Sequence, residues 1–190
     1  MTPTDSPFIG SGSPREAGVS TTAYGRTRRI ARISVFTALA VVGSFIPLPG
    51  PIPSLAFDSA SGYFCALSFA EVEGALVLFL GHLATAYVHG FPLGALHLPL
   101  AIGLAFQGWL MVKVTRRFGM APSTTVGITV NTLLTFLAVP LFGLDATVAF
   151  LLPVFVASLA NGAAAYVVAA SLGRRGVLRS VGGRGSNPAS

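Results

Sequence analysis

The stretch FAEVEGALVLFLGHLATAYVHGFPLGALHLPL, residues 69–100, decides the fold because it combines a long uncharged run with one sharp break. No Asp, Glu, Lys or Arg occurs from Gly74 to Val112. A run of this length accommodates two helical membrane crossings of roughly 17 to 20 residues each. Gly90, Pro92 and Gly94 cluster within the run, and such a cluster predicts a tight loop between the two helices.

All three histidines of the chain lie in this stretch. His82 falls near mid-depth of the first predicted crossing, and His89 and His97 bracket the loop at the membrane surface. An ionisable side chain in lipid is costly, so it normally faces a protein interior or a water-filled cavity. We therefore expect a small polar solute to be held here. The alternative for His82 is a hydrogen-bonded histidine packed in the interior.

The composition identifies an integral membrane protein. The 190 residues are 53% hydrophobic and only 9% charged, with a mean hydropathy of +0.75. Soluble domains have about a quarter of their residues charged. The net charge of +6 therefore reflects orientation in the lipid bilayer rather than nucleic-acid binding. Cys65 is the only cysteine, which excludes an internal disulfide.

Further apolar runs complete the predicted set of spans. The segment from Asp58 to Phe69 is short for a crossing, since only about a dozen residues separate Asp58 from Glu71. The other spans are clear. We expect these other spans at residues 29–46, 97–112, 124–141 and 147–172, in addition to the one that begins near Gly74.

The positions of the positive charges decide whether the short segment crosses. All twelve Lys and Arg residues fall in three clusters. If the segment crosses, every cluster is cytoplasmic, as the positive-inside rule requires; if it does not, two clusters lie outside. We therefore predict an all-α bundle of six transmembrane helices with cytoplasmic termini and a short second helix. The clusters comprise Arg15, Arg26, Arg28, Arg29 and Arg32; Lys113, Arg116 and Arg117; and Arg174, Arg175, Arg179 and Arg184.

The termini differ in composition from the membrane domain. Residues 1–24, rich in Ser, Thr, Pro and Gly near the start, predict a disordered cytoplasmic tail. Residues 25–175 form the predicted six-helix membrane domain, and residues 176–190 a second disordered cytoplasmic tail. A cleaved signal peptide is not expected, because the first apolar run begins only near Ile30.

Small residues form a stripe on the first predicted span. Ala31, Ser34 and Ala38 are spaced i, i+3 and i+7, so they lie on one helix face. Such stripes allow helix backbones to approach closely in lipid. The stripe could pack within the bundle or dock onto another membrane subunit, and the spacing alone leaves both open.

Polar residues on other predicted spans lie near the level of His82. Asn131 and Asn161 approach this depth at 1.5 Å per residue, which predicts a shared polar pocket. Asp58 could cap the short second helix or accept hydrogen bonds from a ligand's hydroxyl groups. Tyr63 and Phe91 are aromatic residues expected near the outer surface, where they could stack on an aromatic ligand or serve as interface anchors.

The same residues argue against a metal site and against catalysis. His82 and His89 share a face but lie about 10 Å apart along a helix axis, too far to bind one ion. The only lysine, Lys113, follows Val112 and not a glycine-rich loop, so the chain is not an ATPase. No nucleophile is paired with a base. We expect no enzyme activity, no metal and no cofactor.

Three segments carry a resemblance to a known family: RISVFTALAVVGS at 32–44, IPLPGPIPSLAFDSASGYFCAL at 46–67, and GALVLFLGHLATAYVHGFPLGALHL at 74–98. The chain resembles the substrate-binding S component of energy-coupling factor (ECF) transporters. It is most similar to members thought to import α-ribazole or related cobalamin precursors. Weaker support comes from Asn131 and from ANGAAA at 160–165.

The resemblance implies capture of a vitamin-like substrate at the outer face of the cell membrane. It also implies association with a transmembrane coupling protein and two ATP-binding subunits. The family's docking motif matches Ser34 and Ala38, with Ser in place of the usual first Ala. Metal-type relatives bind through a His at the second residue, where this chain has Thr2. The expected substrate-binding residues are Asp58, Tyr63, His82, His89, Phe91, His97, Asn131 and Asn161.

Other functions remain as alternatives. Within transport, these are an S component for another vitamin or a secondary carrier that works alone. Outside transport, they are a membrane scaffold or an intramembrane enzyme. A stoichiometric complex with ATPase subunits is the feature that separates the ECF assignment from all of them.

Overall fold

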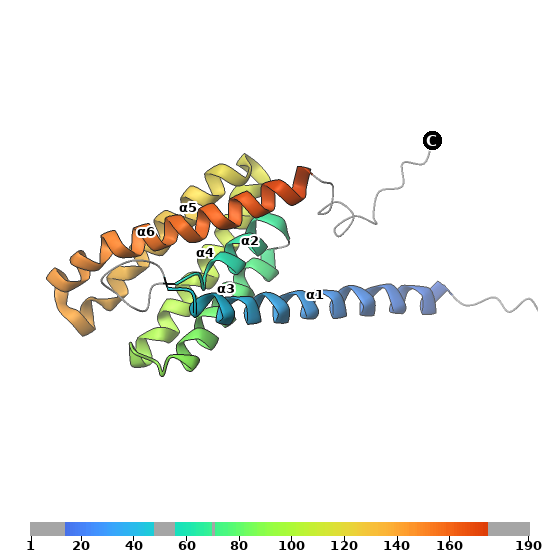
Figure 1. Ribbon diagram of the computed structural model, residues 1–190. Coiled ribbons are helices and arrows are strands. Elements are labelled where there is room, and N and C mark those ends of the chain that lie inside the picture. Colours follow the sequence, from blue (N-terminus) through green and yellow to red (C-terminus); the bar gives the residue numbers. More distant parts are fainter. Residues whose placement is uncertain (1–13, 48–55, 70, 175–190) are drawn as a thin grey trace, which may run out of the picture.

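The computed structural model describes residues 14–47, 56–69 and 71–174, and this part of the chain is helical. The predicted all-α class is therefore confirmed. Figure 1 shows the helices packed side by side, with α1 extending beyond the others. The elements are α1 (Pro14–Ser44), α2 (Ala60–Ser68), α3 (Glu71–Val88), η1 (Gly94–Leu96), α4 (His97–Phe118), α5 (Met120–Leu134), η2 (Thr135–Ala138) and α6 (Val139–Arg174).

The first helix begins earlier than the sequence pattern predicts. α1 starts at Pro14, so it includes residues 14–24 of the predicted N-terminal tail. Proline suits the first helical turn, and no further proline occurs before Pro47. Because a helix propagates more easily than it nucleates, the apolar span extends toward the N-terminus. Residues 1–13 and 176–190 of the two predicted tails lie outside the described residues.

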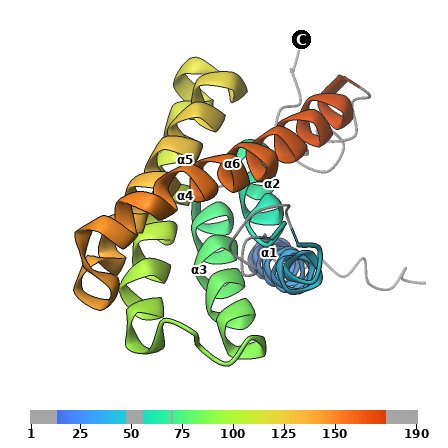
Figure 2. The same cartoon turned by 60° about the vertical axis from the view of Figure 1, so that its left-hand side comes forward.

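The short second helix lies at the centre of the bundle. α2 contacts α1, α3, α4, α5 and α6, and its residues 62–67 are buried. Its nine residues rise only about 13 Å at 1.5 Å per residue, less than the roughly 30 Å hydrocarbon core. Figure 2 shows α2 between α6 and α1. The prediction of a short second helix is confirmed, and the other helices enclose it.

The outer surface of the bundle is apolar. The helical stretches Gly94–Phe118 and Met120–Gly173 are long and apolar enough to cross a membrane, with hydropathies of 1.5 and 2.0, and Val72–Val88 is a shorter apolar helix. Large exposed side chains extend along α1, α4 and α6, where a soluble monomer would not leave a contiguous apolar surface. They include Val35, Leu39, Val42, Ile102, Phe106, Leu152, Phe155 and Val167.

A bend at Gly143 divides α6. The φ angle of Gly143 is 78°, a conformation that residues with a side chain rarely adopt. The hydroxyl of Thr147 donates to the carbonyl of Gly143 at 2.7 Å, which satisfies this backbone oxygen at the bend. The bend falls between the predicted spans 124–141 and 147–172, and it supplies the reversal that two separate crossings require.

The ends of the helices form two groups. Figure 1 shows the N-terminal end of α1 and the C-terminal end of α6 at one end of the bundle. The α3–α4 connection and the N-terminal start of α6 lie at the other. An ion pair ties α1 to α3 within the bundle: Arg32 Nη1 lies 3.3 Å from a carboxylate oxygen of the buried Glu73.

Glycines permit the closest approach of α3 to α4. A Cβ atom added at Gly108 would lie 2.7 Å from the carbonyl oxygen of Gly74 and 2.9 Å from the Cα of Ala75. Both obstacles are backbone atoms, which cannot rotate away as a side chain could. Small residues at this crossing therefore hold the two helices that frame the α3–α4 connection.

The Gly108→Ala variant is expected to be less stable by about 1 to 3 kcal/mol, because the added methyl group must push two backbones apart. Thermal unfolding of the purified protein in detergent measures this loss. Gly25→Ala is the matched control, since Gly25 has nothing within 4 Å of its Cβ position. An equal melting temperature for Gly108→Ala and the wild type would contradict the close approach.

Candidate functional site

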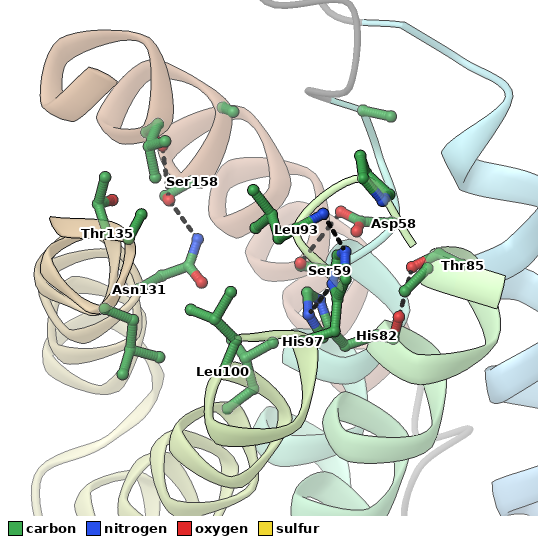
Figure 3. A pocket seen from close by; sticks show the side chains of 18 of the residues that line it. Asp58, Ser59, His82, Thr85, Leu93, His97, Leu100, Asn131, Thr135 and Ser158 are labelled. Atoms are coloured by element: carbon green, nitrogen blue, oxygen red, sulfur yellow. Dashed lines mark hydrogen bonds between the residues drawn. The ribbon is translucent and has the colours of Figure 1, made fainter. Parts of the chain in front are cut away.

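A cavity of about 380 Å³ lies between the helices, and its lining includes Pro92 and Leu93 of the α3–α4 connection. Every α-helix lies next to it: α1 contributes its last residue, α2 is preceded by lining residues, and α3 to α6 contribute side chains. Figure 3 shows polar side chains on both sides of it, with Leu93 and Leu100 among them. The structure brings six of the eight predicted site residues to its wall: Asp58, His82, His89, His97, Asn131 and Asn161.

Two histidines form a hydrogen-bonded pair in the cavity wall. His97 Nδ1 lies 3.1 Å from His82 Nε2, and the backbone N–H of Leu93 donates to His97 Nε2 at 3.2 Å. Because Nε2 of His97 accepts, its proton resides on Nδ1, which donates to His82. Both rings are then neutral, and the α3–α4 loop fixes their orientation (Figure 3).

His89 lies at the exposed rim of the cavity. Its Nε2 is 3.0 Å from the hydroxyl oxygen of Ser44, at the end of α1. That hydroxyl donates its only hydrogen to the carbonyl of Val41 at 2.7 Å, so it accepts from His89. In the described part of the chain, no three His, Cys, Asp or Glu side chains gather as metal ligands would.

The two asparagines are held by hydrogen bonds on the α5–α6 side. Asn131 Nδ2 donates to the Ser158 hydroxyl at 2.6 Å, and that hydroxyl donates to the Val154 carbonyl at 2.7 Å. Asn161 Nδ2 donates at 2.9 Å to the carbonyl of Ala56 and at 2.9 Å to that of Ala157. The oxygen Oδ1 of Asn161 is buried and has no protein partner.

Asp58 lies between α1 and α2, at the cavity wall. Its Oδ1 accepts a hydrogen bond from the Ser59 hydroxyl at 3.1 Å. The N-cap position of α2 is Ser59, and no side chain caps the helix there. The capping alternative for Asp58 is therefore wrong, because the helix starts one residue too late for its carboxylate to reach the free N–H groups.

Two predicted aromatic residues are not part of the cavity lining. Tyr63 is completely buried in the bundle core, and its hydroxyl donates to the carbonyl of Gly127 at 3.1 Å. The expectation of a surface position fails because α2 is enclosed by the other helices. Phe91 is in the connecting loop, 39% exposed, with its ring centroid 5.6 Å from that of His97. It supports the histidine pair from outside the cavity.

The cavity also has lining residues that were not predicted. Thr85, Thr135 and Ser158 carry hydroxyl groups in its wall. Each lies three or four residues from His82, Asn131 or Asn161, so helical periodicity places it on the same face as its predicted neighbour. This spacing is the signal that could have found them. Apolar residues complete the wall, among them Leu93, Leu100, Leu104, Phe142, Phe150 and Val154.

Comparison with known proteins decides the family. Residues 28–173 match the family model described as ECF transporter, substrate-specific component. The chain belongs to this family. No curated protein and no solved structure matches it. As an S component, it is a multi-pass integral membrane protein and a transport protein rather than an enzyme. S components bind substrate and pair with an ECF energising module.

The predicted docking stripe of this S component lies on the surface. Ala31, Ser34 and Ala38 are exposed on α1. Ala40, in contrast, is buried, and its Cβ lies 3.0 Å from the Cβ position of Gly81 on α3. The small residues of α1 therefore serve two faces. One packs inside the bundle, and the other is open to the membrane.

Proposed function

We propose that this S component captures α-ribazole or a related cobalamin precursor in the cavity at the end of the bundle. The observation that carries the proposal is the mixed lining of the cavity, to which polar and apolar side chains both contribute. A molecule with an aromatic base and a hydroxylated sugar has the same combination of polar and apolar groups. The volume of about 380 Å³ lies near the lower end of ligand pockets, which range from about 300 to 1,000 Å³.

The polar side chains of the cavity lining suit a ligand with hydroxyl groups. The carboxylate of Asp58 and the free Oδ1 of Asn161 both accept hydrogen bonds, and a sugar hydroxyl donates one. A buried acceptor without a partner is costly, so a ligand that supplies the missing donor gains that free energy on binding. The polar contacts thus favour a solute with several hydroxyl groups.

The apolar side chains of the cavity lining suit a planar ring. Phe142 and Phe150 lie edge to face, with ring centroids 5.6 Å apart, and both line the cavity beside Leu100 and Leu104. Burial of an aromatic ring against such side chains is favourable through the hydrophobic effect and through ring–ring contacts. The aromatic base of the ligand would contact these apolar side chains while the sugar of the ligand reaches Asp58.

The orientation in the membrane follows from charge. We infer that the end with the cavity faces outward and that both termini are cytoplasmic. The N-terminal end of α1, whose sequence carries arginines, and the C-terminal end of α6, which ends at Arg174, lie at the opposite end of the bundle, as the positive-inside rule requires. The cavity then collects solute from outside the cell. The exposed stripe at Ala31, Ser34 and Ala38 is available to the transmembrane coupling protein, which joins two ATP-binding subunits.

Purification from its own membrane tests the function. The S component is expected to copurify with stoichiometric ATPase subunits and to release, on denaturation, a small molecule with the mass of α-ribazole or a related precursor. A released molecule of another vitamin class would replace the proposed substrate. Uptake by the chain alone, without ATPase subunits, would instead support a standalone secondary carrier.

A further inference from the structure

The carboxamide of Asn161 can offer a ligand only its oxygen. Its Nδ2 donates to two backbone carbonyls, those of Ala56 and Ala157, and this uses both of its hydrogens. The residue is 2% exposed, and its Oδ1 has no protein partner. Rotation of the amide would place that oxygen against two carbonyl oxygens, so the orientation is locked.

The carboxamide of Asn131 is oriented in the same sense. Its Nδ2 donates to the hydroxyl oxygen of Ser158, which cannot donate in return because its hydrogen goes to the Val154 carbonyl. Figure 3 shows the nitrogen turned toward Ser158 and the oxygen on the opposite side of the amide. Ser158 thereby acts as a positioning residue for Asn131.

Among the described residues that line the cavity, no side chain carries a fixed positive charge. The lining includes the acid Asp58 and neither lysine nor arginine. The N–H of Leu93 holds His97 in a form that donates to His82, so both rings stay neutral. His89 is at the exposed rim and donates its Nε2 hydrogen to Ser44. An anionic ligand would meet acceptors without a counter-charge.

We propose that this cavity selects a neutral or cationic solute rich in hydroxyl or N–H donors and rejects the phosphorylated form of the same solute. This inference rests on the proposed capture function and specifies the chemical class of its substrate. Phosphate oxygens only accept hydrogen bonds when ionised, so they cannot satisfy Asn161 and would be repelled by Asp58. Removing such a charge from water without pairing it is strongly unfavourable.

Titration of the purified S component with α-ribazole and with α-ribazole 5′-phosphate tests the selection. The phosphate ester should bind at least about a hundredfold more weakly, which corresponds to roughly 2.7 kcal/mol. Equal or tighter binding of the ester would overturn the proposal. Gln107→Ala should leave the ratio of the two affinities unchanged, because Gln107 does not line the cavity.

The Ser158→Ala variant tests the orientation of Asn131 separately. Without the hydroxyl acceptor, the amide of Asn131 can rotate and present its N–H groups. The ratio of the affinities for α-ribazole and α-ribazole 5′-phosphate should therefore decrease severalfold. If the binding of both probes were weakened equally, Ser158 would have a purely structural role, and this part of the proposal would be overturned. Ser171→Ala is the control, because Ser171 is exposed on the same helix and outside the cavity lining.

Failure of the α-ribazole assignment would be recognised by weak binding of both probes. The charge selection is then tested on the small molecule released from the S component purified from its own membrane. A neutral or cationic molecule at neutral pH, measured by electrophoresis coupled to mass spectrometry, supports the selection. A phosphate- or carboxylate-bearing molecule overturns it.

Discussion

Replacing Ser34 and Ala38 together by tryptophan is expected to abolish uptake by whole cells while leaving substrate binding by the isolated S component intact. Both residues are exposed on α1, and they do not line the cavity. Small side chains on this face let another membrane helix approach the α1 backbone. Two indole rings would hold the partner helix away, so the energising module could no longer dock.

Radioactive substrate uptake and copurification of the ATPase subunits measure the docking defect, and titration of the purified variant measures binding. The control pair is Ala149→Trp with Ala163→Trp, which adds the same bulk to exposed positions of α6. That pair should retain uptake. Loss of substrate binding in the Ser34 and Ala38 variant would show that the stripe packs against the bundle and not against a partner.

Asn161→Ala is expected to weaken substrate binding by up to about a hundredfold. One lost hydrogen bond at a buried site costs roughly 1 to 3 kcal/mol, which is about five- to a hundredfold in affinity. The loss of affinity in Asn161→Ala is expected near the upper limit because Asn161 also donates a hydrogen bond to the carbonyl of Ala56, two residues before Asp58. His82→Ala should show a smaller loss, near the lower limit, since it removes the partner of His97.

Calorimetric titration with the released substrate checks both variants. Gln107→Ala is the matched control, because Gln107 is a completely buried carboxamide on α4 that does not line the cavity. It should alter thermal stability and leave affinity nearly unchanged. Unchanged affinity in both Asn161→Ala and His82→Ala would move the site to the outer loop around Asp58, His89, Phe91 and His97.

Much of the helical architecture could be predicted from local pattern. The uncharged run from Gly74 to Val112 and its Gly–Pro cluster correspond to α3, the loop and α4. The helix spacing of Ala31, Ser34 and Ala38 placed them on one face, and the structure shows that face exposed. Each of these features depends on composition and periodicity within one segment, so it can be predicted from the sequence alone.

The start of α1 and the position of Tyr63 could not be predicted in the same way. Residues 14–24 carry no apolar period, yet they continue a helix nucleated by the span that follows. Tyr63 follows a polar segment and suggested a surface position, but the helices around α2 bury it. Burial depends on which distant segments cover a residue, and no local pattern records that.

The helical membrane class, the short second helix and the candidate polar residues could be predicted from the sequence, because charge, length and helical period act within single segments. Which of those residues share a cavity, and which atoms they present, depends on how the helices pack. Asn161 bonds to Ala56, 105 positions away, and His97 bonds to His82 across the α3–α4 loop. Such contacts set the direction of a carboxamide or the tautomer of a ring, and they exist only once separate helices have packed together.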